Sequence, residues 1–284
     1  MFARADQLLV EQLQDNFTLH AVDFHWEGFS PHLVCHDSND SQISEFDLKD
    51  VRFSVSRKRT CIGMFDDDGK YVPCPKSAPV TRFSQCPDCA GQSWIPHQEC
   101  IFEPKCDGED CDLDFCRREH VLYLAFYDTR MKIGMSSTRR IEQRLIEQGA
   151  DAFSIIGKWG SRKKAREAEK DFSEKLRIPQ SHRQDILLKS LSRPVDVRGI
   201  GERYEALRST LTERFHLDPE RLNWLDKYPV ELPLRDSPQL VESWGSHRGD
   251  FVGIKGRWLI FDSDGLKAIN LADMPARFLA RRLA

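Results

Sequence analysis

The feature that most constrains this chain is a concentration of cysteines in a stretch too irregular to fold by itself. Eight of its nine cysteines fall within 56 residues, among prolines, aspartates and glycines and without lasting hydrophobic periodicity. A stretch of this kind cannot build an apolar core of its own and needs a staple. The eight cysteines are Cys61, Cys74, Cys86, Cys89, Cys100, Cys106, Cys111 and Cys116.

The rest of the sequence favours a metal ion over disulfides as this staple. The first residues, MFARADQLLVEQLQDNFTLH, do not have the apolar run of a signal peptide, so we expect a cytoplasmic protein whose thiols stay reduced. We also expect no membrane association, because no apolar run approaches the roughly 20 residues that cross a bilayer. Cys86 and Cys89 form a Cys-x-x-Cys pair, and this spacing can turn both sulfurs toward one tetrahedral zinc ion.

We therefore expect one or two structural zinc sites in this segment. The pairing of the cysteines does not follow from the sequence, and His97 and His120 are alternative ligands. Some thiols can instead be buried and free, as we expect for Cys35, which lies apart from the others. A closed site with four protein ligands supports folding and leaves no coordination position for chemistry.

The charges are unevenly distributed, although the formal net charge is only −3. Residues 1–50 carry two Lys or Arg against ten Asp or Glu, whereas residues 130–183 carry fourteen against seven. A local excess of seven positive charges suits binding to a nucleic-acid backbone. The alternative is that these charges only form the solvated faces of ordinary helices.

The amino-acid composition and the hydrophobic pattern change along the chain, and together they predict an α+β fold in four parts. The cysteine-rich segment separates stretches with strand-like alternation from a more regular strand and helix pattern. In the last part, DSDG between two apolar runs predicts a hairpin, and the strands around it suggest a small barrel. The parts are a β-rich module at 1–56, a zinc-binding segment at 57–118, an α/β domain at 119–190, and a linker helix over 201–217 within a β-rich region at 191–284.

The α/β domain has the pattern strand, strand, helix, strand, helix. HVLYLAFY and RMKIGMSS have the composition of strands, a helix follows to about Gln148, and AFSIIGKW precedes a second helix. Glu169 lies within the apolar stripe of that second helix. A carboxylate on the core side needs a partner, which we expect to be Mg²⁺ or Arg144, unless Glu169 lies at the edge of the stripe and reaches water. The stripe consists of Ala165, Ala168, Phe172 and Leu176.

The order of these motifs resembles the core of the GIY-YIG endonuclease superfamily. A tyrosine in LYL, a KIG in the next strand, an arginine in RLIEQG and a glutamate on a later helix follow one another as in that superfamily. Over residues 57–180 the chain is also similar to a family of prokaryotic proteins that couple a cysteine-rich segment to such a domain. The resemblance implies a small GIY-YIG-like α/β fold and a divalent-metal-dependent phosphodiesterase acting on DNA or RNA.

The resemblance also assigns roles to four residues. Tyr123 would orient or deprotonate the attacking water, Arg144 would neutralise charge on the phosphate, and Glu169 would bind Mg²⁺ or Mn²⁺. Lys132 stands where the superfamily most often has its second tyrosine, so it would bind phosphate but puts cleavage in question. The alternatives are a half-buried strand tyrosine and an exposed strand lysine. Further cations expected to hold nucleic acid are Arg139, Arg140, Arg162, Lys163 and Lys164.

Two further hypotheses concern binding rather than catalysis. A non-catalytic, zinc-containing nucleic-acid-binding protein on the same scaffold is the alternative to the endonuclease. The C-terminal part interleaves aromatic and basic residues, which suits stacking of single strands but is more often the core of a small β domain. These residues are Trp244, Phe251, Trp258 and Phe261 with His247, Arg248, Lys255 and Arg257.

Overall fold

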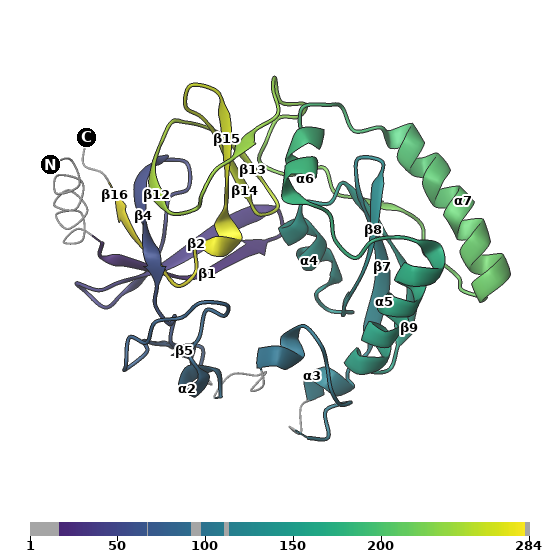
Figure 1. The fold of residues 1–284 in the computed structure, drawn as a ribbon, viewed down its shortest axis with the longest axis horizontal. Helices are drawn as coiled ribbons and strands as arrows, with labels where there is room; N and C mark the ends of the chain where they lie inside the picture. Colours follow the sequence, from purple (N-terminus) through teal and green to yellow (C-terminus); the bar gives the residue numbers. More distant parts are fainter. Residues whose placement is uncertain (1–16, 67, 92–97, 111–113, 282–284) are drawn as a thin grey trace, which may run out of the picture.

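A computed structural model describes residues 17–66, 68–91, 98–110 and 114–281 (Figure 1). The expected ligands His97 and Cys111 lie outside the described residues. The fold is mixed α and β, as the sequence predicts. In Figure 1, strands from both ends of the chain gather in one half, the α/β module with helix α7 forms the other, and the cysteine-rich segment runs along the lower side of both.

The α/β module is a four-stranded sheet in the order β10-β9-β7-β8, with both neighbours of β7 antiparallel to it. Every residue of β7 is buried, which explains the unbroken apolar run HVLYLAFY. The strand and helix order is the one expected from the sequence. The bounds are β7 (His120–Tyr127), β8 (Arg130–Ser137), α4 (Ile141–Gln148), β9 (Ala152–Trp159), α5 (Arg162–Leu176), α6 (Gln184–Ser190), α7 (Val197–Phe215) and β10 (Asn223–Trp224).

Individual residues explain where helix α4 ends and where helix α5 begins, and both helices carry residues of the candidate site described below. Helix α4 ends at Gly149, whose φ of +75° is in the left-handed region, and Gly149 and Ala150 donate backbone hydrogen bonds to the last turn. Helix α5 begins after Ser161, whose hydroxyl accepts a hydrogen bond from the backbone N–H of Lys164 at 3.3 Å. Helix α5 packs against β7, β8 and β9 through the apolar stripe expected from the sequence.

Strands from the two ends of the chain form one six-stranded sheet, in the order β12-β4-β16-β1-β2-β3. This differs from the expected separate N- and C-terminal modules, because β16 pairs with β1 and β4, and β12 pairs with β4. Antiparallel pairing between strands that are 190 or more residues apart leaves no local trace in the sequence. The bounds are β1 (Leu19–Glu27), β2 (Ser30–Asp37), β3 (Ile43–Glu45), β4 (Arg52–Arg59), β12 (Gly245–Arg248) and β16 (Arg277–Arg281).

The remaining C-terminal strands form an open four-stranded sheet rather than the expected barrel, in the order β11-β15-β14-β13. The predicted hairpin is confirmed, since β14 and β15 pair across Asp264 and Gly265, both at positive φ. The aromatic residues Trp258 and Phe261 are buried, so the core interpretation holds for them. The bounds are β11 (Gln239–Leu240), β13 (Asp250–Lys255), β14 (Trp258–Asp262), β15 (Leu266–Asn270) and the short helix η3 (Leu271–Asp273).

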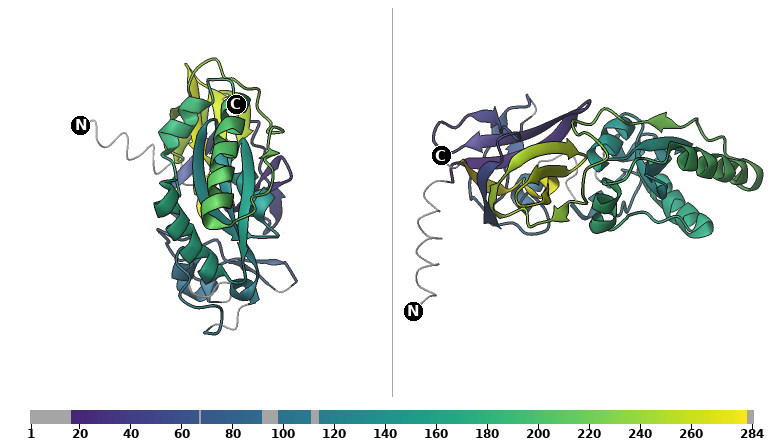
Figure 2. Two further views of the ribbon diagram at one scale, coloured as in Figure 1. Left: turned by 90° about the vertical axis from the view of Figure 1, so that its right-hand side faces the viewer. Right: turned by 90° about the horizontal axis from the view of Figure 1, so that it is seen from above.

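The turn between β13 and β14 locks this sheet onto the α/β module. The ammonium group of Lys255 forms a buried ion pair with the carboxylate of Asp151, at the start of β9. Gly256, at φ +58°, lies so close to Gly149 that a Cβ atom on it would be 2.4 Å from the Gly149 nitrogen. The indole N–H of Trp26 on β1 donates to the Gly256 carbonyl at 3.0 Å. Three parts of the chain therefore meet at one turn. Seen from above in Figure 2, the purple N-terminal strands and the yellow C-terminal strands lie together on one side of the teal α/β module.

We predict that replacing Lys255 by Met destabilises the whole fold. The change leaves the buried Asp151 carboxylate without its cation, which costs about 3–5 kcal/mol in comparable cases. Urea unfolding of the two variants Lys255→Met and Lys227→Met measures the difference. Lys227 is exposed nearby, and its replacement should change the free energy of unfolding by less than about 0.5 kcal/mol. Equal, small effects in both variants would show that the ion pair does not hold the parts together.

Candidate functional site

Four cysteines converge in a buried cluster that can hold a metal ion. The sulfur atoms of Cys61, Cys74, Cys86 and Cys89 all lie within 4.8 Å of one another. The sulfurs of Cys74 and Cys86 are 3.9 Å apart, close to the separation of about 3.8 Å that follows from tetrahedral geometry at the usual zinc–sulfur length. The site suits zinc in ligand type, number and spacing, and it confirms that the Cys-x-x-Cys pair is completed by two more thiols.

The local backbone is shaped around these sulfurs. The sulfur of Cys61 accepts hydrogen bonds from the backbone N–H groups of Gly63 at 3.4 Å and Cys86 at 3.2 Å, which favour a thiolate. Gly63 has a φ of +75°, and a Cβ atom there would be 2.2 Å from the carbonyl oxygen of Val72, so only glycine fits. The surrounding elements are short: β5 (Met64–Phe65), β6 (Tyr71–Val72) and α2 (Pro87–Ala90).

The other expected zinc ligands lie outside this cluster. Cys116 is buried in α3 (Asp114–Arg117), and Cys100 lies in η2 (Gln98–Ile101). Cys106 accepts a backbone N–H from Gly108 at 3.4 Å, the same arrangement that Cys61 has with Gly63. Cys35 is a buried free thiol as expected, and its burial raises its pKa to about 12.

The four residues assigned by the resemblance line one cavity of about 580 Å³. Tyr123 comes from β7, Lys132 from β8, Arg144 from α4 and Glu169 from α5. The opposite wall belongs to the cysteine-rich segment, which contributes the exposed side chains of Ile101 and Phe102 as well as Phe115. Glu169 is the only carboxylate among the described lining residues, against one lysine and four arginines. The cavity is therefore strongly cationic, with an apolar and aromatic rim.

Tyr123 is fully buried and lies directly across from Gly134 in the β7–β8 pair. A Cβ atom on Gly134 would come within 2.5 Å of the Tyr123 hydroxyl oxygen, so the glycine of KIG provides the space for the ring. The hydroxyl accepts a hydrogen bond from the side-chain amide of Gln148 at 3.4 Å. Burial raises the pKa of Tyr123, and the nearby Arg144 only partly opposes this. Tyr123 is therefore a neutral hydrogen-bonding group at physiological pH, not a base.

Glu169 is buried as expected, but its partner is a residue that the sequence reasoning did not consider. Its carboxylate accepts a hydrogen bond from the guanidinium of Arg166, one helical turn earlier, at 2.6 Å. Arg166 also donates to the side chain of Gln180 at 2.8 Å and pairs with Glu103 at 3.4 Å. The expected pairing with Arg144 is not what the structure has. The sequence does contain a signal for this pair, because Arg166 and Glu169 are three residues apart on one helix and so lie next to each other on its surface.

Lys132 and Arg144 bring positive charge to the cavity without a matching acid. Neither side chain forms an ion pair with any carboxylate in the described part of the chain. The pKa of Lys132 is lowered to about 8, mainly because the ammonium group is desolvated and then because Arg144 and Arg257 repel its charge; Glu169 opposes the shift. A partly buried lysine beside an exposed arginine in one cavity favours an anionic ligand.

Arg162, which is expected to hold nucleic acid, lines the cavity, but its guanidinium is engaged by the protein itself. Its side chain is buried and donates to the backbone carbonyls of Cys100 and Ile101, both at 2.6 Å. Its guanidinium also lies over the Phe115 ring, 5.4 Å from the centroid. These contacts clamp the cysteine-rich wall to helix α5, because a buried guanidinium must satisfy its donors. Lys163 is half-buried beside it.

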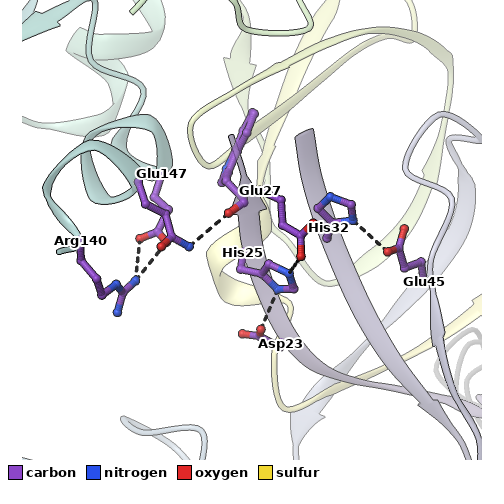
Figure 3. A network of polar contacts seen from close by, with 9 residues as sticks. Asp23, His25, Glu27, His32, Glu45, Arg140 and Glu147 are labelled. Atoms are coloured by element: carbon purple, nitrogen blue, oxygen red, sulfur yellow. Dashed lines mark hydrogen bonds and ion pairs between the residues drawn. The ribbon is translucent and has the colours of Figure 1, made fainter. Parts of the chain in front are cut away.

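The remaining expected cations lie on the surface. Arg139 and Lys164 are exposed, and neither lines the cavity. Arg140 does line it, but its guanidinium is 3.1 Å from the Glu147 carboxylate on the same helix, so part of its charge is neutralised (Figure 3).

Figure 3 also shows a histidine and carboxylate network on the neighbouring strands. His25 and His32 stack with ring centroids 5.4 Å apart, and each binds its own carboxylate, Asp23 at 2.8 Å and Glu45 at 2.9 Å.

His120 is a further cavity residue whose role as a zinc ligand was considered from the sequence. Its Nδ1 atom is held by the Arg118 carbonyl at 2.9 Å, and its buried Nε2 atom has no hydrogen-bond partner among the described residues. Its pKa is lowered by burial, so the ring is neutral and Nε2 can accept a hydrogen bond. His120 lines the cationic cavity and does not belong to the four-cysteine cluster.

Comparisons with known proteins give a family without an assigned role. The sequence profile of the family described as "Protein of unknown function (DUF2797)" matches residues 49–276, which include the cysteine-rich segment, the α/β module and the turn between β13 and β14. No curated protein and no solved structure matches the chain. Among the described residues, no helix has the length and apolar character that a membrane span requires.

We predict that the four-cysteine cluster binds one metal ion per chain. Elemental analysis of purified Cys89→Ser should show one equivalent less than the parent protein, because a serine hydroxyl does not replace a thiolate ligand. Cys35→Ala removes a buried thiol outside the cluster and should leave the metal content unchanged. An unchanged metal content in Cys89→Ser would contradict the assignment.

We predict that anion binding to the cavity weakens as the pH rises through about 8. Lys132 is protonated below its pKa and neutral above it, so a hydrogen bond to an anion loses its charge, worth about tenfold in affinity. The other groups facing Lys132 do not change charge in this range: the pKa of His182 is lowered, those of Tyr123 and Tyr127 are raised, and arginines stay charged.

Titration calorimetry with sulfate between pH 6.5 and 9 measures this dependence, because the charge of sulfate is constant there. In Lys132→Arg the affinity should stay constant with pH. A parent protein whose affinity does not fall between pH 7 and 9 would contradict the role given to Lys132.

Proposed function

The chain belongs to the family of proteins of unknown function DUF2797, and from the cavity in this fold we propose that it is a nucleic-acid-processing protein, a divalent-metal-dependent phosphodiesterase acting on DNA or RNA. The observation that carries the proposal is a cavity lined by five Lys or Arg side chains and a single buried glutamate. Such a site attracts a phosphate group and offers one carboxylate for a divalent cation.

The resemblance to the GIY-YIG superfamily supports the same conclusion. Its four matched residues come from four elements and line one cavity. The elements follow one another as strand, strand, helix, strand and helix, and the first strand is flanked by the other two. The convergence of these four residues on one cavity supports the proposal.

Glu169 is the residue that would hold Mg²⁺ or Mn²⁺. One oxygen of its carboxylate already accepts a hydrogen bond from Arg166, which leaves the other for a cation. Mg²⁺ commonly keeps several waters and binds proteins through one or two carboxylates plus substrate phosphates, so a single glutamate is a sufficient anchor. When bound, the ion would polarise the phosphate and lower the pKa of a coordinated water.

The other side chains of the cavity would bind the phosphate group and orient the water molecule. Lys132 and Arg144 hold the phosphate oxygens, and Arg144, which is exposed at the cavity, stabilises charge that builds on them during displacement. Tyr123 orients water through its hydroxyl, because its raised pKa keeps it from acting as a base. His120 offers a buried, neutral nitrogen as a hydrogen-bond acceptor in the same cavity.

The metal cluster has a structural role in this proposal. Zinc on Cys61, Cys74, Cys86 and Cys89 would staple a segment that has only short elements of its own. A second structural zinc would draw on Cys100, Cys106 and Cys116. The same segment supplies the wall of the cavity, so its fold bears directly on the site.

A second function is favoured by one specific observation. The carboxylate of Glu169 is bound by Arg166, and a lysine replaces the second tyrosine of the superfamily. A protein that binds nucleic acid through this cavity without cleaving it would need the cations but not a free glutamate. This non-catalytic, zinc-containing binding protein is the alternative.

Cleavage assays with matched variants separate the two functions. We expect the parent protein with Mg²⁺ or Mn²⁺ to cut at least one of single-stranded DNA, duplex DNA, branched DNA and RNA. Glu169→Gln should lower the rate at least a hundredfold while keeping the affinity within a few-fold, because the amide still accepts the Arg166 hydrogen bond. Glu167→Gln is the control, since Glu167 is exposed on the same helix and does not line the cavity.

The remaining outcomes are also informative. Binding by the parent without cleavage of any substrate supports the alternative function. Neither binding nor cleavage, or an affinity that does not depend on salt concentration, contradicts both functions.

A further inference from the structure

A second, smaller cavity of about 260 Å³ lies beside the first and shares Lys132 and Ser181 with it. It forms where the α/β module meets the C-terminal sheet, and its wall there carries Arg257 from the turn between β13 and β14. Its polar lining also includes Gln148, His182 and Gln184, and no carboxylate lines it among the described residues. Lys132 therefore faces two cavities, each of which has at least one arginine.

Arg257 is a cation without a partner. In the described part of the chain its guanidinium forms no ion pair and no hydrogen bond, and it lies close enough to Lys132 to depress the pKa of that lysine. Arg144 repels Lys132 in the same way from the first cavity. Glu169, whose charge opposes this repulsion, is already bound to Arg166. Three cations in this arrangement repel one another, and anions in both cavities would relieve the repulsion.

The backbone that carries Arg257 is held from both sides. The preceding residue, Gly256, packs against Gly149 and accepts the Trp26 N–H, and Lys255 before it is paired with Asp151. The carbonyl of Arg257 itself accepts a backbone hydrogen bond from Leu271 at 2.8 Å. The junction of the two sheets therefore fixes the backbone of one arginine at the edge of the proposed phosphate site of the other module.

We propose that Arg257 and Lys132 form a second phosphate subsite, so that the ligand of this protein is a strand with at least two consecutive phosphates. The proposal rests on the function proposed above and makes it more specific. One phosphate would lie between Lys132 and Arg144, and its neighbour along the strand between Lys132 and Arg257. A mononucleotide fills only one of these positions, whereas an oligonucleotide fills both.

The salt dependence of binding tests this directly. With the full chain carrying Glu169→Gln to prevent cleavage, Arg257→Ala should lower the affinity for a single-stranded oligonucleotide about tenfold or more. It should also reduce the slope of log affinity against log salt by about 0.7, the value for one phosphate contact on a single strand. Affinity for a nucleoside monophosphate should not change. Arg257→Lys, which keeps the charge, should restore most of the slope.

Arg221→Ala is the matched control, because Arg221 is an exposed arginine of the same C-terminal region that lines neither cavity. It should leave affinity and slope unchanged, and equal urea midpoints for the two alanine variants would show that both are folded. Unchanged affinity and slope in Arg257→Ala would overturn the subsite while leaving the proposed function intact. So would an equal loss for the monophosphate and the oligonucleotide. Failure of the Glu169→Gln chain itself to bind any oligonucleotide would instead overturn the proposed function.

Discussion

The buried ion pair between Asp151 and Lys255 is the interaction on which the arrangement of the parts depends. Burying two charges is favourable only when each satisfies the other and the remaining hydrogen-bonding positions are filled. Asp151 meets this condition because its second oxygen accepts the backbone N–H of Asp128 at 2.6 Å. Lys255 also lies over the ring of Tyr228, 5.3 Å from the centroid, and the Tyr228 hydroxyl donates to the Ala150 carbonyl. Residues 148–151 (QGAD) and 254–256 (IKG) therefore form the two sides of one interface. Their packing and their ion pair explain their composition, and no catalytic role is needed.

The pairing of Tyr123 with Gly134 shows that residues matched to the GIY-YIG motifs also have a packing role. The ring is buried, and its space exists only because the opposite residue on β8 has no side chain. A sequence that retained a tyrosine and an Ile-Gly at these positions would do so for the stability of the sheet alone. The evidence for a site comes instead from charge. Arg144 and Arg257 both repel the ammonium group of Lys132, which is a cost to the folded state that packing does not require.

The sequence predicted those parts of the fold that rest on local patterns. The strands and helices of the α/β module follow from apolar periodicity, and the Cys-x-x-Cys pair identified half of the metal cluster. Its partners Cys61 and Cys74 could not be separated from Cys100, Cys106 and Cys116, because the path of the chain decides which sulfurs meet. The shared six-stranded sheet was missed for the same reason. Charged residues were misjudged where burial decides their role: Arg162 clamps two carbonyls, and Arg166 rather than Arg144 binds Glu169.

The cysteine-rich segment connects the metal cluster with the cavity, because Phe83, close to Cys86, packs on Phe102 of the cavity wall. The four-cysteine cluster fixes the chain up to Cys89, and the residues that follow η2 form the aromatic wall of the cavity. Arg162 ties that wall to helix α5, the same helix that carries Glu169. The cysteine-rich segment has only short helices and strands. Its position therefore depends on the metal cluster at one end and on the hydrogen bonds of Arg162 at the other. A metal without any chemical role can thereby determine whether the cavity keeps its shape, because one of the walls is made by the segment that the metal folds.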